Sequence, residues 1–178
     1  ASTGAVLWKI DVGNPSADTY DGHYNWASPL IAGGYAYIGI SSFGDCPLVQ
    51  GGLLKVDLAT HQVVASWKAV PDGQLGGGVW TSPTLDTATS TVYLDTGTQD
   101  GSGQTTAAAM IALDANTLAL KGSWQVPLAQ QVADNDWGNT PTLLGGGLVA
   151  ATNKNGVVYA FQGSNVSAGP VWEARIAD

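Results

Sequence analysis

Three short segments of the chain carry side chains that could act together on a bound ligand. The first is Gly76-Gly77-Gly78-Val79-Trp80, in which a tryptophan follows three glycines. An indole face suits a planar ring system, because stacking removes both flat surfaces from water. Glycines also let the backbone approach a ligand closely. The alternative is that Trp80 is a packing wedge between structural units, like Trp26 and Trp137.

The second segment, Asp134-Asn135-Asp136-Trp137-Gly138, offers two carboxylates in a short loop. Carboxylates are among the groups that accept protons in general base catalysis. Asp136 stands directly before the aromatic residue and is the better candidate, with Asp134 as the reserve. The alternative is a loop that enters a strand, in which Asp and Asn side chains bond nearby backbone N–H groups.

The third segment, Asn153-Lys154-Asn155-Gly156, places a cation in a turn. Lys and Arg together total only six residues in the chain, so one of them at this turn is informative. A cation can stabilise negative charge that develops during a reaction. Asn-Gly is also typical of a type I′ hairpin, in which Lys154 would simply face solvent.

The composition excludes several kinds of partner. The net charge is −8 and no basic cluster is present, which argues against nucleic acid. No apolar run approaches the roughly 20 residues of a spanning helix, so no membrane insertion is expected. The single Cys46 excludes an internal disulfide. Low lysine content with abundant Thr, Ser, Gly and Asn indicates an exported protein, periplasmic or secreted.

The three segments belong to three copies of one unit of about 55 residues. The tryptophans near the start of the copies are 54 and 57 residues apart and are Trp26, Trp80 and Trp137. Two short β-rich runs follow in each copy, and a last run ends on a second tryptophan: Trp67, Trp124 or Trp172. Because no segment has a sustained 3.6-residue period, four strands and essentially no helix are expected in each unit.

Four antiparallel strands in tandem repeat predict an all-β chain of β-propeller blades. Each blade is a small twisted sheet that buries its faces against its neighbours. The predicted blades span 24–70, 79–127 and 136–176, and the whole of 1–178 is a partial propeller. Residues 1–12 are predicted as the last strand of a preceding blade.

Three blades do not close a ring, since known propellers have at least four. The chain is therefore expected to be a fragment that is cut at equivalent points of two blades. Its open faces would take the missing blades or further copies of the same chain.

The ends of the blades resemble the tryptophan-docking repeat Asp-x-x-Thr-Gly-x-x-x-Trp of the PQQ (pyrroloquinoline quinone) dehydrogenases. Thr3-Gly4 with Trp8 fits directly, and Trp8 is expected to dock against the next blade. The repeats that end on Trp67 and Trp124 fit less directly, because another residue replaces the Gly of the pattern and two residues are added before the Trp. The polyvinyl-alcohol-dehydrogenase-like branch is most similar, through Gly-Gly-x-Trp-x-Ser-Pro and Asp-x-Asp-(aromatic)-Gly.

The resemblance implies an eight-bladed ring, of which this chain holds three complete four-stranded blades and one orphan strand. It also implies oxidation of an alcohol or sugar with a PQQ-type cofactor. Trp80 would stack on the quinone, and Lys154 would reach its oxygens. Asp136, or else Asp134, would take the hydroxyl proton as the hydride leaves.

The calcium site of the family is altered in this sequence. The family places a Glu in the loop before the third strand of one blade and an Asn after the Thr-Gly of the next. Here Asp45 is the metal candidate but stands one residue out of register, and Thr98 replaces the Asn as a cofactor contact. Calcium takes several oxygen ligands, usually including carboxylates, so a regular calcium site is not expected. The altered loop favours the alternative function, a non-catalytic propeller that binds protein, peptide or glycan partners.

Overall fold

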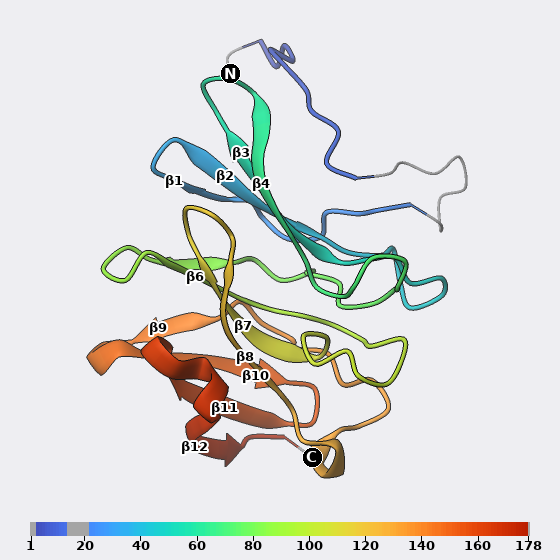
Figure 1. Ribbon diagram of the computed structural model, residues 1–178, viewed down its shortest axis with the longest axis vertical. Coiled ribbons are helices and arrows are strands. Elements are labelled where there is room, and N and C mark those ends of the chain that lie inside the picture. Colours follow the sequence, from blue (N-terminus) through green and yellow to red (C-terminus); the bar gives the residue numbers. More distant parts are fainter. Residues whose placement is uncertain (1–2, 14–21, 178) are drawn as a thin grey trace.

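Three four-stranded antiparallel sheets lie one above another along the long axis of the molecule (Figure 1). The computed structural model describes residues 3–13 and 22–177. The first sheet contains β1 (Leu30–Ala32), β2 (Tyr35–Ile40), β3 (Gly52–Asp57) and β4 (Gln62–Lys68). The second contains β5 (Thr84–Asp86), β6 (Thr91–Asp95), β7 (Ala109–Asp114) and β8 (Leu120–Gln125). The third contains β9 (Thr142–Leu144), β10 (Leu148–Asn153), β11 (Val157–Gln162) and β12 (Pro170–Arg175).

Within each sheet the strands pair antiparallel in chain order, as a propeller blade requires. The all-β fold with three four-stranded blades is thereby confirmed. Short 3₁₀ turns are the only helical segments in the described part of the chain: η1 (Leu128–Gln130), η2 (Gly145–Gly147) and η3 (Gly163–Ala168). None of the described helices has the length and apolarity needed to cross a membrane.

Residues 3–13 do not form the strand that the repeat predicts. A strand needs a hydrogen-bonding partner, and no described strand pairs with this segment. Trp8 nevertheless stacks on His61, in the turn between β3 and β4, with 4.4 Å between the ring centroids. The segment therefore contacts the next blade through its tryptophan, and its place as the end of a preceding blade stays a prediction.

The core consists of two layers of side chains, one between each pair of neighbouring sheets. Strand β6 contributes to both, because successive side chains of a strand point to opposite faces. Val92 and Leu94 pack with the first sheet, and Tyr93 packs with the third. All five residues of β6 are buried, which explains the aliphatic and aromatic residues at both alternations of its sequence.

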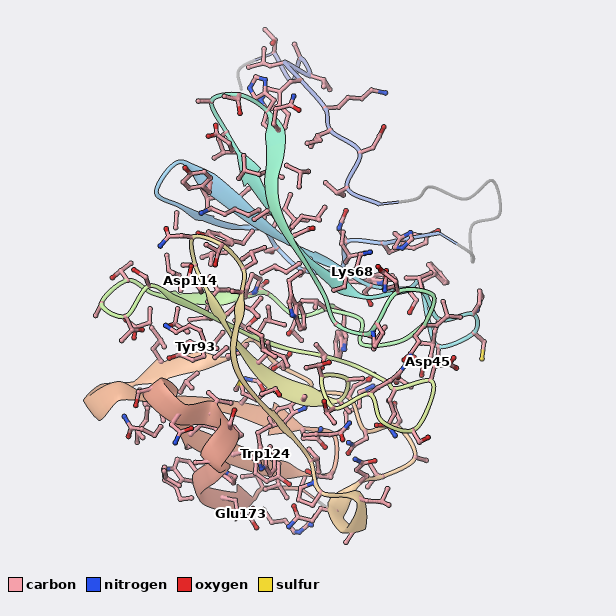
Figure 2. All side chains as sticks on the ribbon, viewed as in Figure 1. Asp45, Lys68, Tyr93, Asp114, Trp124 and Glu173 are labelled. Atoms are coloured by element: carbon pink, nitrogen blue, oxygen red, sulfur yellow. The ribbon has the colours of Figure 1, made fainter. Side chains whose placement is uncertain are left out.

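The tryptophan that ends each blade packs toward the blade that follows. Trp67 lies against the core layer between the first and second sheets. Trp124 lies among the aromatic rings of the third sheet, with centroids 5.1 Å from Tyr159 and 5.4 Å from Phe161 (Figure 2). Trp172 ends the third blade and is 44% exposed. Trp67 and Trp124 thus pack against the blade that follows, and their assignment to the docking repeat stays a prediction.

Candidate functional site

Loops from all three blades meet in a pocket of about 290 Å³. The first blade contributes the loop after β2, the second the segment before β5, and the third the segment before β9 and the turn between β10 and β11. The lining residues are Trp26, Ser41, Ser42, Phe43, Gly44, Asp45, Trp80, Asp136 and Lys154. Four of the six residues singled out in the sequence thus line one pocket, and Thr98 and Asp134 contact two of them.

Lys154 is held at the pocket by its turn and by two carboxylates. Its backbone N–H donates to the Asp136 carbonyl at 2.9 Å, and the neighbouring Asn153 side chain donates to the Asn135 carbonyl at 2.8 Å. The Lys154 ammonium donates to both oxygens of Asp134 at 2.8 Å and to Asp136 at 3.0 Å. Lys154 is therefore an ion-paired group at the edge of the pocket, and its side chain is still 36% exposed.

Opposing effects act on the pKa of Lys154. Partial burial lowers it, but the hydrogen bonds and charges of Asp134 and Asp136 together raise it above the usual value. The side chain is a cation at any physiological pH.

Asp136 is the most enclosed carboxylate of the pocket. One oxygen accepts a hydrogen bond from the Thr98 hydroxyl at 2.9 Å, and the other faces Lys154. Gly97 lies against the same carboxylate, since a Cβ at this position would stand 2.7 Å from the first oxygen. Thr98 and Gly97 come from the loop after β6, so the second blade fixes a carboxylate that belongs to the third.

Trp80 forms the aromatic wall of the pocket beside Lys154. The Lys154 ammonium lies 5.4 Å from the centroid of its ring, within the range of a cation–π contact. Backbone hydrogen bonds hold the preceding segment on both sides: Val79 donates to Ile40 of the first blade, and Gly77 donates to Thr98. The position of the indole is therefore set jointly by two blades.

The three tryptophans that start the repeats have different environments. Trp137 is fully buried within the core and fits the wedge interpretation, whereas Trp26 is 54% exposed and lines the pocket. Trp80 is half-buried and lines the pocket as well. The wedge interpretation thus fits one of the three positions.

Asp45 lies on the loop after β2, at the edge of the stacked sheets (Figure 2). Burial, followed by the negative charges of Asp136 and Asp134, raises the pKa of this carboxyl, and Lys154 and Thr98 partly offset the increase. The pocket therefore carries more negative charge than Lys154 neutralises.

The donor set does not fit a calcium ion as it is arranged. The Lys154 ammonium occupies the space between Asp134 and Asp136, and the Thr98 hydroxyl is already directed to Asp136. No group of three His, Cys, Asp or Glu side chains in the described ranges is placed to hold a metal. Calcium prefers six to eight oxygen ligands, so no chemical step is assigned to it here.

The same residues present a surface for a planar ring, although the Lys154 ammonium is already paired with two carboxylates. The pocket offers an indole face, an ammonium group and the hydroxyls of Ser41 and Ser42. The glycines before Trp80 lie against protein atoms of neighbouring segments and do not line it. Sequence reasoning missed Trp26, Phe43 and the two serines as pocket residues. Two signals were available in the sequence. Phe43 and the serines directly follow the predicted second strand, and Trp26 is the repeat equivalent of Trp80.

Comparison with known proteins supports the fold. No family model matches the chain. A polyvinylalcohol dehydrogenase of Sphingopyxis sp. (strain 113P3) is 23% identical over 228 residues, which cover 99% of this chain and 34% of the relative. The chain therefore spans about a third of the length of this relative.

Two solved structures share the architecture at low sequence identity. A europium-containing methanol dehydrogenase superposes with a TM-score of 0.73 at 16% identity, over 91% of this chain and 35% of that one. The quinohemoprotein alcohol dehydrogenase ADHIIG of Pseudomonas putida HK5 gives 0.69 at 17% identity, over 96% and 30%. The chain has the PQQ-type β-propeller fold of the quinoprotein alcohol dehydrogenases and covers part of that propeller.

Proposed function

We propose that the full-length protein is an exported dehydrogenase that oxidises an alcohol or sugar with a PQQ-type cofactor, and that this chain supplies much of its active site. One observation carries the proposal. Trp80, Asp136 and Lys154, from three separate loops of two blades, line one pocket and contact one another through Lys154.

Each of the three residues has a distinct role. When bound, the quinone supplies the acceptor for the hydride that leaves the alcohol carbon. Trp80 binds the ring by stacking and fixes its plane. Asp136, oriented by Thr98, accepts the proton of the substrate hydroxyl. Lys154 presents a positive charge where negative charge develops.

Asp134 acts on this chemistry through Lys154. Both of its oxygens bind the ammonium at 2.8 Å, and its side chain is mostly exposed. It does not line the pocket. Its proposed role is therefore to hold Lys154, while Asp136 is the base.

Titration with PQQ tests the proposal at the level of binding. PQQ is expected to quench the tryptophan emission of the full-length protein, and Trp80→Ala should weaken the affinity about ten-fold or more, because the stacking surface is lost. Trp67→Phe is the matched control, since Trp67 packs between the first two blades and does not line the pocket. A folded protein that binds no PQQ, with or without added calcium, would rule the proposal out.

Substitution of Gly97 tests whether the position of Asp136 matters. In Gly97→Ala the new methyl would meet the Asp136 carboxylate, which must shift away from Thr98. A displacement of about 1 Å can cost about 100-fold in rate, so kcat should fall by one to two orders of magnitude. Gly101→Ala, on the same loop with open space around it, should leave kcat unchanged. An unaltered kcat in Gly97→Ala would mean that the exact position of the Asp136 carboxylate does not affect the reaction.

The second candidate function is a non-catalytic propeller that binds a protein, peptide or glycan partner. The misfit of the pocket to calcium favours it. The PQQ titration separates the two functions, because only the dehydrogenase requires quinone binding that depends on Trp80.

The end faces of the stack are proposed to contact the remaining blades of the propeller. Val63 and Val64 on the first sheet and Val171 and Trp172 on the third are exposed. Expressed alone, the 178-residue chain is expected to self-associate, because apolar sheet faces of this kind are unfavourable in water. Light scattering would measure this, and a monomer at micromolar concentration would contradict it.

A further inference from the structure

A buried carboxyl outside the pocket lining connects two of the pocket segments. Asp95 is the last residue of β6 and is only 1% exposed. One of its oxygens accepts a hydrogen bond from the hydroxyl of Thr81, the residue directly after Trp80. The other oxygen has no hydrogen-bond partner. A fully buried polar atom without a partner is costly, so its retention calls for an explanation.

Residues that follow Asp95 in the chain contact the pocket residue Asp136. Gly97 follows two positions later and abuts Asp136, and Thr98 donates to the same carboxylate. The backbone of Gly97 donates to the Gly78 carbonyl at 2.8 Å. The contact between Asp95 and Thr81 thus joins two segments, one that carries the stacking tryptophan and one that orients the proposed base.

We propose that Asp95 is a positioning residue of the pocket, whose buried carboxyl connects the Trp80 segment to the Thr98 loop through Thr81.

The neutral form follows from the surroundings of the carboxyl. Burial raises the pKa of Asp95 to about 8; the hydrogen bond from Thr81 opposes the increase, and the negative charge of Asp136 adds to it. An ionised Asp95 would place a second negative charge in the interior with one oxygen unpaired, which is strongly unfavourable. The charged side chains at the meeting loops are Asp45, Asp100, Asp134, Asp136 and Lys154, and the ammonium is engaged by Asp134 and Asp136. No described cation is therefore available to Asp95.

The consequence is a link between ionisation of Asp95 and the position of Trp80. Below about pH 8 the neutral carboxyl suits its dry surroundings. Above it, the carboxylate still accepts from Thr81, but its second oxygen must reach water or a cation, and the loop that follows Asp95 must shift to allow this. A role confined to general stability would change the unfolding temperature without moving Trp80.

The fluorescence emission of Trp80 provides the test, and it can be measured without a cofactor. It is obtained as the difference between the full-length protein and its Trp80→Phe variant, from pH 6 to pH 9.5. We expect the difference spectrum to change with a midpoint near pH 8. Asp95→Asn, which keeps an acceptor for Thr81 and cannot ionise, should retain the pH 6 spectrum throughout. Asp100→Asn, an exposed acid on the loop after β6, is the matched control and should keep the transition.

Thr81→Val tests the hydrogen bond itself. It keeps the shape of the side chain and removes the hydroxyl, so Trp80 emission should differ from the parent protein already at pH 6. Two outcomes would overturn the proposal: a Trp80 signal without a transition near pH 8, or the same transition in Asp95→Asn.

A second measurement rests on the proposed function. PQQ affinity should fall at least three-fold between pH 7 and pH 9 in the parent protein and stay constant in Asp95→Asn. If the folded protein binds no PQQ but shows the Trp80 transition, the dehydrogenase function fails and the role of Asp95 stands. If PQQ binds with a pH dependence that Asp95→Asn does not alter, the role of Asp95 fails and the function stands.

Discussion

Asp136→Asn is expected to lower kcat for alcohol oxidation by about 100- to 10,000-fold, the range that a lost general base costs. The amide has the same shape: its oxygen can accept from Lys154 while its NH₂ group donates to the Thr98 hydroxyl, so the pocket should stay assembled. The amide cannot take the hydroxyl proton, however. PQQ affinity and the apparent unfolding temperature should therefore change little, while steady-state turnover with an artificial electron acceptor is nearly lost.

Asp134→Asn is the matched control for this prediction. It removes the same charge from the other partner of Lys154, at an exposed position outside the pocket lining. A loss of up to about ten-fold is expected, because Lys154 keeps its contact with Asp136. Equal losses in the two variants would mean that the net charge around Lys154 matters and that Asp136 has no special role as a base. Full activity of Asp136→Asn would exclude it as the base.

The repeat made the fold predictable from the sequence. Tryptophans at a regular spacing and four short β-rich runs in each copy specify a blade, since each sheet must bury both faces against its neighbours. The structure has the predicted number of sheets and strands. Trp67 and Trp124 pack toward the blade that follows each of them.

The contents of the pocket could be predicted only in part. Trp80, Asp136 and Lys154 stand in short segments with recognisable residue types, and the structure places them together. That Asp134 and Asp136 both bind Lys154 depends on how the turn of one hairpin lies against a preceding loop, which spacing along the chain does not reveal. Asp95 gave no signal, because an Asp at the end of a strand is ordinary in sequence and becomes unusual only when its burial is known.

The segment 3–13 shows a different limit. Its residues match the docking repeat, yet a strand is defined by its partner as well as by its own sequence. Trp8 alone retains an expected contact, with His61. Local pattern therefore predicted the contact of the side chain, while the strand that it also predicts remains without a described partner and stays a prediction.

Trp124→Ala is expected to cost about 3 kcal/mol of unfolding free energy, at the lower end for loss of a large aromatic side chain because Trp124 is half-buried. Its indole contacts Trp137, Tyr159 and Phe161 of the third blade, with centroids 5.1 to 6.4 Å away. The backbone of Gly169 also lies against its ring nitrogen. Truncation to alanine leaves a cavity at the junction of two blades, so the effect should spread beyond the second blade. Chemical denaturation of the full-length protein, followed by far-UV circular dichroism, measures it.

Leu120→Ala in the same strand is the control, since Leu120 is 48% exposed and lies outside both core layers. Its substitution should cost less than about 0.5 kcal/mol, as expected for a surface position. Trp124→Phe should recover part of the loss, because a smaller ring still packs against Tyr159 and Phe161. If Trp124→Ala and Leu120→Ala destabilise the protein equally, the tryptophan at the end of the blade contributes no more than an ordinary surface residue. Docking between these blades would then have to come from Tyr93 of β6 and Met110 of β7.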